Sequence, residues 1–291
     1  MIPESLPACS SLPSVEPHGT TRASASIVVD ESNVYSAAGR GVTVIPKSGA
    51  APWALVSDTI ARAIAEDDTN IYFAGDQLWS VPKTGGAVRV LFDQPTDGIA
   101  VSDDSVFFCD YPLGTRPKLR RWSEPTGVEE VATFTDASSC GRLVVQDRNV
   151  YRIPLATPWA RASRVRIADG AEDLIADNIQ VSRGFAVAGP FLYFSEADSQ
   201  SIQRLSLADG TRSTLFSFAG DPSAIDTDGS LLYVIVQYLD AVTKHYTPAL
   251  LRMTVEGSDP CVVGSAAFDA SLVVSGDRAY WTGDCLIHGA R

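Results

Sequence analysis

Three arginines and three aspartates occupy related positions in the sequence, where together they could hold a small charged ligand. Each lies nine to twelve residues before an aromatic residue that recurs along the chain; the six are Arg62, Arg142, Arg183, Asp97, Asp221 and Asp269. Because the arginine guanidinium is a planar fork that pairs with carboxylates and phosphates, such a group could clamp an anionic or zwitterionic molecule. The alternative is that the six charges neutralise one another as a structural ring of ion pairs.

The same aspartates, together with one histidine, could instead support metal-assisted chemistry. His245 lies in the longest expected loop, "QYLDAVTKHYTPAL", and with Asp97, Asp221 or Asp269 it would supply a base and oxygen ligands for a lyase or hydrolase. A single histidine in a loop is more often simply solvated, and arginines among the acids favour binding over catalysis. We therefore expect no resident cofactor, with a divalent ion at the same place as the alternative. The stretch "DTDGS" resembles the start of a calcium loop, but we interpret it as a strand-connecting turn.

Four aromatic residues outside the recurring frame are further candidates for ligand binding. They lie in inserted loops and are Tyr111, Trp159, Tyr238 and Tyr246. Exposed rings of this kind stack on sugars and peptides. The alternative, that these rings are partly buried and anchor their own loops, remains open.

The five cysteines indicate disulfides more than a metal site. They include no CxxC pair and no histidine at ligand spacing. Cys109 and Cys140 are expected on the same face of neighbouring repeats, which predicts a disulfide between them and an oxidising compartment. The alternative is a pair of free thiols in a reducing cell. The pairing of Cys9, Cys261 and Cys285 stays open.

The elements that must position these residues recur seven times. The recurring aromatic residues are Tyr35, Tyr72, Phe107, Tyr151, Tyr193, Tyr233 and Tyr280. Each copy contains two strands around a turn rich in Asp, Asn, Gly or Ser, and a second pair follows around a turn such as "PKTGG" or "ADG". No segment has the length and period of a helix. Seven copies of four short strands, about forty residues apart, predict an all-β, seven-bladed β-propeller.

Length differences among the copies fall between the second and third strands. In a propeller, these connections lie on the face where each innermost strand begins, and we call it the loop-rich face. Functional sites favour irregular loops on a rigid scaffold. We therefore expect any ligand at the mouth of the channel on this face.

The two ends of the sequence complete each other. The last copy stops after three strands, and its fourth strand is expected near the N-terminus, in Ser14 to Gly19. This predicts a flexible segment at residues 1–12 and one propeller domain at residues 13–291, with the last blade closed by an N-terminal strand. "LPAC" resembles the end of a lipoprotein signal, in which Cys9 would carry a lipid in a longer precursor; a linker after a removed leader is the alternative.

The frame "VVSGDRAYWTGDCLIH" resembles the YWTD propellers of the low-density-lipoprotein-receptor type. Tyr280, Trp281 and Thr282 match the motif, and Gly283 stands where it has aspartate. The repeat is also similar to that of bacterial secreted propellers of unassigned function. Related groups include gluconolactonase-like hydrolases and streptogramin lyases with a metal at the top of the channel, but their ligand set does not map onto this sequence. The resemblance therefore implies a fold and a location for a site, without an activity.

Composition narrows the range of partners. The sequence has no apolar run long enough to span a bilayer. Its net charge of -12 argues against a nucleic-acid partner, which would require a positive surface. We expect a secreted or periplasmic monomer that binds a small molecule, glycan or protein without catalysis.

Overall fold

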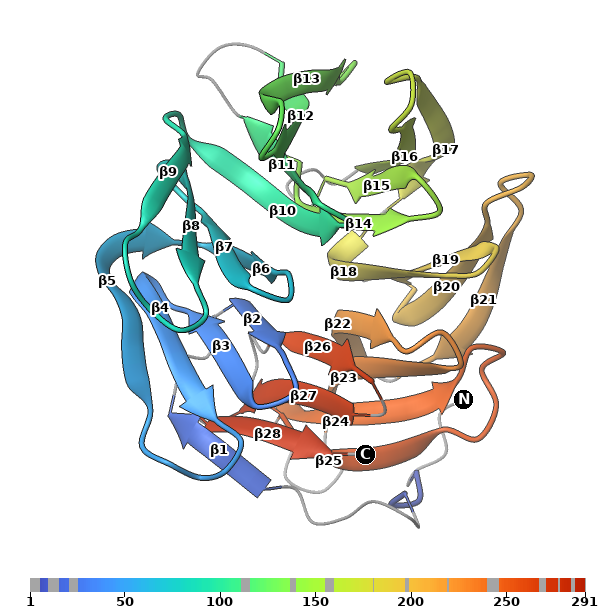
Figure 1. Ribbon diagram of the computed structural model, residues 1–291. Helices are drawn as coiled ribbons and strands as arrows, with labels where there is room; N and C mark the ends of the chain where they lie inside the picture. Colours follow the sequence, from blue (N-terminus) through green and yellow to red (C-terminus); the bar gives the residue numbers. More distant parts are fainter. Residues whose placement is uncertain are drawn as a thin grey trace.

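The computed structural model contains seven four-stranded antiparallel sheets arranged around a common axis (Figure 1). It describes residues 6–9, 16–20, 26–110, 116–136, 140–154, 160–179, 181–196, 199–218, 220–239, 246–266, 271–276, 278–283 and 286–290. No helix occurs in these ranges. The predicted all-β, seven-bladed propeller is confirmed.

Blades 1 to 3 each consist of four consecutive strands, which follow one another from the innermost outward. Blade 1 contains β2 (Ser26–Val29), β3 (Asn33–Ala37), β4 (Gly39–Pro46) and β5 (Trp53–Ala61). Blade 2 contains β6 (Ala63–Glu66), β7 (Asn70–Ala74), β8 (Leu78–Pro82) and β9 (Arg89–Phe92). Blade 3 contains β10 (Thr96–Ser102), β11 (Ser105–Asp110), β12 (Lys118–Ser123) and β13 (Gly127–Thr133).

Blades 4 to 6 repeat the same order. Blade 4 contains β14 (Arg142–Gln146), β15 (Asn149–Ile153), β16 (Ala160–Arg166) and β17 (Glu172–Ile179). Blade 5 contains β18 (Val181–Ala188), β19 (Phe191–Glu196), β20 (Ser201–Ser206) and β21 (Arg212–Ser217). Blade 6 contains β22 (Gly220–Thr227), β23 (Leu231–Leu239), β24 (Tyr246–Thr254) and β25 (Cys261–Ser265).

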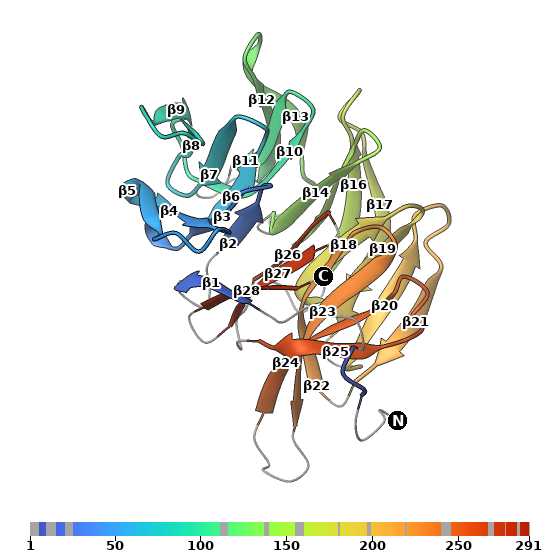
Figure 2. The same ribbon diagram turned by 60° about the horizontal axis from the view of Figure 1, so that its bottom comes forward.

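Blade 7 combines the two ends of the chain. Its strands are β26 (Leu272–Ser275), β27 (Arg278–Gly283), β28 (Leu286–Ala290) and the N-terminal β1 (Glu16–Thr20). β1 pairs antiparallel with β28, with Glu16 opposite Gly289 and Thr20 opposite Leu286, and both views show the two strands side by side (Figures 1 and 2). The predicted closure of the last blade by an N-terminal strand is confirmed, and the strand begins two residues later than expected.

The recurring aromatic residue lies on the second strand of each blade and is buried between blades. In blade 1, the Tyr35 hydroxyl donates to Asp30 Oδ2 at 2.8 Å, while Asp30 Oδ1 accepts two backbone N–H groups of its own turn. Blade 2 repeats this arrangement with Tyr72 and Asp67 at 2.6 Å. Burial raises the pKa of both aspartates, but these donors outweigh it and hold each pKa below its usual value. The turn aspartate thus shapes the turn and satisfies a tyrosine hydroxyl that burial would otherwise leave unpaired.

The hydrophobic core is divided into clusters that lie between neighbouring blades. For example, Tyr35 and Val44 of blade 1 pack with Ile71 and Phe73 of blade 2. Because each sheet is covered on both faces by its neighbours, the strands near the axis are apolar almost throughout. This packing fixes the innermost strands around the channel.

The predicted disulfide between Cys109 and Cys140 is confirmed. Cys109 lies near the end of β11 in blade 3, and Cys140 precedes β14 in blade 4; both are fully buried. The bond therefore joins two neighbouring blades.

A second disulfide, which the sequence left open, joins Cys9 to Cys261 across 252 residues. Beside it, Ala8 forms a parallel bridge with Val262, and the segment at residues 6–9 lies along β25, the outermost strand of blade 6 (Figure 2). Because its sulfur is bonded to Cys261, Cys9 cannot also carry a lipid, which corrects the lipoprotein interpretation. The division of the chain between residues 12 and 13 stays a prediction, and Cys285 lies outside the described residues.

Candidate functional site

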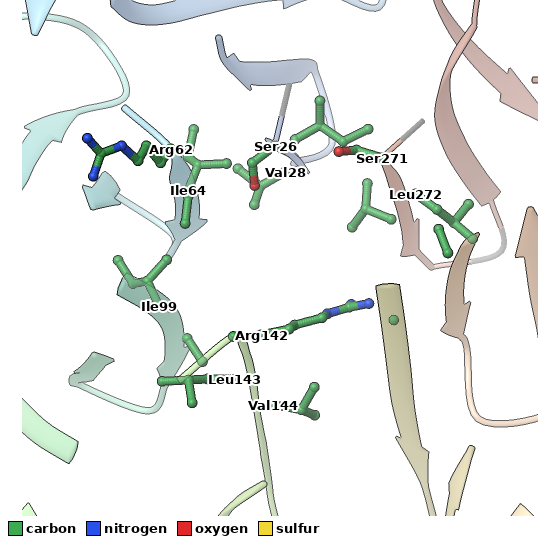
Figure 3. A pocket seen from close by; sticks show the side chains of 18 of the residues that line it. Ser26, Val28, Arg62, Ile64, Ile99, Arg142, Leu143, Val144, Ser271 and Leu272 are labelled. Carbon is green, nitrogen blue, oxygen red and sulfur yellow. The ribbon is translucent and has the colours of Figure 1, made fainter. Parts of the chain in front are cut away.

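The innermost strands of all seven blades line a cavity of about 690 Å³ on the propeller axis. Its walls are largely aliphatic, with Val28, Ile64, Ile99 and Leu143 among the side chains around it (Figure 3). The polar residues that line it are Ser26, Arg62, Asp97, Arg142, Ser223 and Ser271. The cavity therefore combines an apolar interior with a small set of polar groups.

Comparison of the seven blades reveals two residues that break the pattern of the channel. On each innermost strand, one residue is paired with the recurring aromatic residue; six of these are Val28, Ala65, Ala100, Val144, Ala186 and Val273, and the seventh is Asp226. The residue two positions earlier is small in six blades, where it is Ser26, Ala63, Gly98, Gly184, Ala224 or Ser271, and in blade 4 it is Arg142. Each departure places one charged side chain where the other blades have a small or aliphatic one.

These two exceptional residues form an ion pair with each other across the channel. Arg142 Nη2 lies 3.0 Å from Asp226 Oδ1, and Arg142 Nη1 donates to the Ile225 carbonyl oxygen at 2.9 Å. Asp226 Oδ2 in turn accepts the backbone N–H of Val274 at 2.8 Å. Figure 3 shows the Arg142 side chain extended across the pocket. The pair links blades 4, 6 and 7 and satisfies backbone groups on the free edges of two innermost strands.

Asp97 is positioned by an irregularity in β10. The strand register shifts between Asp97 and Ile99, and Gly98 between them has a φ of 62°. A Cβ on Gly98 would lie 2.4 Å from the Gly141 carbonyl oxygen, so only glycine fits where these two blades meet. The bulge allows the Asp97 carboxyl to accept hydrogen bonds from the N–H groups of Gly98 and Gly141.

The Asp97 carboxyl is partly buried and has no basic partner in hydrogen-bond contact among the described residues. Burial raises its pKa above the usual value, although its two backbone hydrogen bonds and the charge of Arg62 act in the opposite direction. Asp97 is therefore a half-buried acid in the cavity wall whose described hydrogen-bond donors are backbone N–H groups.

Arg62 contacts the cavity but turns its charge elsewhere. Its guanidinium points away from the pocket (Figure 3) and lies 3.3 Å from Asp76, in the turn between β7 and β8. Both side chains are more than half exposed, so this pair contributes less than about 1 kcal/mol to stability. Asp221 is exposed on β22 and is not among the residues that line the cavity.

The described charges at the mouth do not form the ion-pair ring that the sequence suggested. Arg62 pairs with Asp76 and Arg142 with Asp226, and neither aspartate belonged to the expected set. The reason is geometric: Asp76 is supplied by an adjacent turn of the same blade, and Asp226 lies opposite the start of β14. Four of the candidate residues lie outside the described residues: Tyr111, Trp159, His245 and Asp269. Three others lie on described strands, but their side chains are outside the described part: Arg183, Tyr238 and Tyr246.

Sequence reasoning missed Asp226 because it begins the stretch "DTDGS", which was assigned to a turn. That assignment is correct for Asp228, whose Oδ1 accepts the N–H groups of Ser230 and Leu231 at 2.8 Å. β22, however, continues to Thr227, so Asp226 belongs to the innermost strand. Comparing equivalent positions across the seven copies would have identified it.

Within the described ranges, no three His, Cys, Asp or Glu side chains come together as a metal site. Chemically, the described part of the cavity presents mainly aliphatic side chains, a compensated charge pair and one half-buried acid.

Comparison with known proteins agrees on the fold. No protein-family model matches the sequence, and neither does any curated protein. A YWTD-type propeller in the nidogen/laminin complex has a TM-score of 0.57 at 15% identity, covering 80% of this chain and 93% of that chain. The computationally designed Ika8 protein has a TM-score of 0.60 at 10% identity, covering 94% of this chain and 98% of that one.

Virginiamycin B lyase from Staphylococcus aureus is also similar, with a TM-score of 0.69 at 13% identity, and the match covers 96% of this chain and 98% of that chain. The likeness to the nidogen/laminin structure supports the YWTD-type resemblance at the level of structure. Identities this low show a shared propeller fold alone. The chemistry of this chain must therefore be argued from its own residues.

Proposed function

We propose that this protein is a non-catalytic recognition module that binds its ligand at the loop-rich face, with part of the ligand entering the channel. The observation that supports this is the axial cavity, which is lined by aliphatic side chains together with six polar or charged residues. Its volume of about 690 Å³ falls within the range of about 300 to 1,000 Å³ that is typical of small-molecule pockets. The ligand is a small molecule, a glycan, or a side chain presented by a protein.

The polar groups of the cavity favour binding over turnover. Arg142 is already held by Asp226 and the Ile225 carbonyl, so it is a fixed part of the wall. Serine hydroxyls at Ser26 and Ser271 can donate to or accept from a ligand. The alternative of a metal-assisted lyase or hydrolase would rest on His245 with Asp97, Asp221 or Asp269.

The disulfides of the chain support an oxidising setting. Disulfides persist in oxidising compartments, and this chain contains two of them. The described residues include no helix that could cross a bilayer. We propose a secreted or periplasmic location and a monomeric state, without a nucleic-acid partner.

The proposal is tested by a thermal-shift screen of metabolites, glycans and peptides, in the presence and absence of divalent ions. Stabilising compounds are then titrated against two variants that carry the same new side chain. Ser26→Trp fills the cavity from the innermost strand of blade 1, whereas Ser57→Trp places the indole on the exposed face of the outermost strand, β5.

We expect the stabilisation to be lost in Ser26→Trp and kept in Ser57→Trp. Equal binding by both variants would show that the channel is not the site. Stabilisation that requires a divalent ion and is followed by conversion of the compound would support the lyase or hydrolase instead.

A further inference from the structure

We infer that the channel binds a small primary alkylamine, with its ammonium group held by Asp97 and its alkyl group packed against the aliphatic walls. This inference rests on the proposed function, because it takes the channel to be the ligand site. It names the chemical class of the ligand and the residue that selects it.

The first argument is the balance of charge among the described residues of the cavity. Arg142 is neutralised by Asp226 at 3.0 Å, and Arg62 points away toward Asp76. Asp97 has no such partner in the described part of the chain, where only the N–H groups of Gly98 and Gly141 donate to it. The uncompensated charge of the described wall is therefore negative.

The second argument is the unused hydrogen-bonding capacity of Asp97. A carboxylate can accept about four hydrogen bonds, and two backbone donors leave room for an ammonium group. Partial removal of a carboxylate from water without a cation is unfavourable, and an opposite charge beside it relieves this cost. The raised pKa of Asp97 is consistent with a carboxyl group that lacks such a partner.

The third argument excludes other ligand classes. An anion would have to compete with both Asp226 and the Ile225 carbonyl for the guanidinium of Arg142. A quaternary ammonium ion has no N–H to donate and is usually held by aromatic rings, but no aromatic side chain is among the described residues that line the cavity. Val28, Ile64 and Leu272 instead suit an alkyl group. The net charge of -12 would also attract a cation over a distance.

Three isosteric probes separate the contribution of the charge from that of the alkyl group. Calorimetric titrations with 3-methylbutylamine, 3-methylbutan-1-ol and 3-methylbutanoate present the same branched chain with a cationic, neutral or anionic head. We expect the amine to bind at least about tenfold more tightly than the alcohol, which corresponds to about 1.4 kcal/mol, and the acid to bind more weakly still.

Two aspartate variants assign the effect to one carboxyl group. Asp97→Asn removes the charge inside the cavity, and Asp104→Asn removes an exposed charge from the turn between β10 and β11 of the same blade. The amine should lose about tenfold in affinity in Asp97→Asn and remain unchanged in Asp104→Asn. Equal losses in both variants would reduce the effect to long-range electrostatics and overturn the inference.

A pH series on the unaltered protein tests the inference even if Asp97→Asn does not fold. The charged groups around Asp97 include Arg62, and Arg142 with Asp226 across the cavity. Because Asp97 must be ionised to hold the ammonium group, amine affinity should rise from pH 4 to pH 7 while alcohol affinity stays constant. Parallel pH profiles for the two probes would overturn the role of Asp97.

The outcomes also separate this inference from the proposed function. If the amine and the alcohol bind equally well and both are lost in Ser26→Trp, the channel is a binding site but does not select cations. If no probe binds while compounds from the screen are still lost in Ser26→Trp, the channel is the site and the amine inference is wrong. If Ser26→Trp affects no ligand, the proposed function itself fails.

Discussion

Replacing the ion pair that crosses the channel should show that blades 4 and 6 are energetically coupled. Arg142→Ser gives blade 4 the residue that blades 1 and 7 have at the equivalent position, and Asp226→Val gives blade 6 an aliphatic residue as in most other blades. Both single variants and the double variant therefore follow the pattern of the repeat. Together with the unaltered protein they form a double-mutant cycle.

The contacts of the pair determine how much each variant should lower the free energy of unfolding. Asp226→Val removes the acceptor of Arg142 and of the part-buried Val274 N–H, so it should lower the free energy of unfolding by about 2 to 4 kcal/mol. Arg142→Ser leaves Asp226 bonded to Val274, so it should cost less, about 1 to 2 kcal/mol. Because the Arg142 side chain is 34% exposed, solvent screens the pair, and we expect a coupling energy of about 1 kcal/mol.

Urea unfolding of the four proteins at pH 7 measures this coupling. The exposed pair between Arg62 and Asp76 provides a matched control, in which the same kind of cycle should give less than about 0.5 kcal/mol. If the effects of Arg142→Ser and Asp226→Val on the free energy of unfolding add to within about 0.5 kcal/mol, the two residues do not act together and the reasoning is refuted.

Three further outcomes follow from the described contacts. Gly98→Ala should destabilise the protein by at least about 2 kcal/mol more than Gly49→Ala in urea unfolding, because both glycines have positive φ but only Gly98 faces a carbonyl oxygen at 2.4 Å; equal losses would contradict the close approach. Replacing Cys9 and Cys261 with alanine should cost about 2 to 5 kcal/mol, measured in the same way, and a reducing agent should leave the variant less affected than the unaltered protein. Asp67→Asn should have a lower free energy of unfolding than the unaltered protein, by a constant amount above about pH 5. Because the pKa of Asp67 is lowered in the folded protein, this difference should shrink as the pH falls below about 4 and the carboxylate is protonated. A difference that does not change with pH down to about 2 would contradict this.

The fold was predictable because the same four-strand pattern recurs seven times along the sequence. Seven copies of one strand pattern give seven independent indications of the same blade, and the spacing of turns and aromatic residues survives differences in any one copy. The same regularity predicted the ring closure by β1 and the disulfide between Cys109 and Cys140, since both follow from where each copy begins and ends.

The candidate site was less predictable because its contacts break the repeat. The partner of Arg142 depends on which residue lies across the axis, and this is set by how far β22 extends before its turn. The path of the N-terminal segment is another such case, because nothing in the repeat indicates that residues 6–9 follow blade 6 before β1 joins blade 7. Sequence position gives the depth of a residue in the channel, but not the partner toward which its side chain extends.

The bond between Cys9 and Cys261 also determines how the protein would transmit mechanical force. A pull applied before Cys9 and after Ala290 passes through the disulfide directly into β25, so the covalent path of the force bypasses the 251 residues between the two cysteines while the bond is intact. The load falls on β26 to β28 and on their pairing with β1, the strands nearest the seam. Blades 1 to 5 and the channel wall that they form would thus be shielded from stretching, and reduction of one bond would expose them to it.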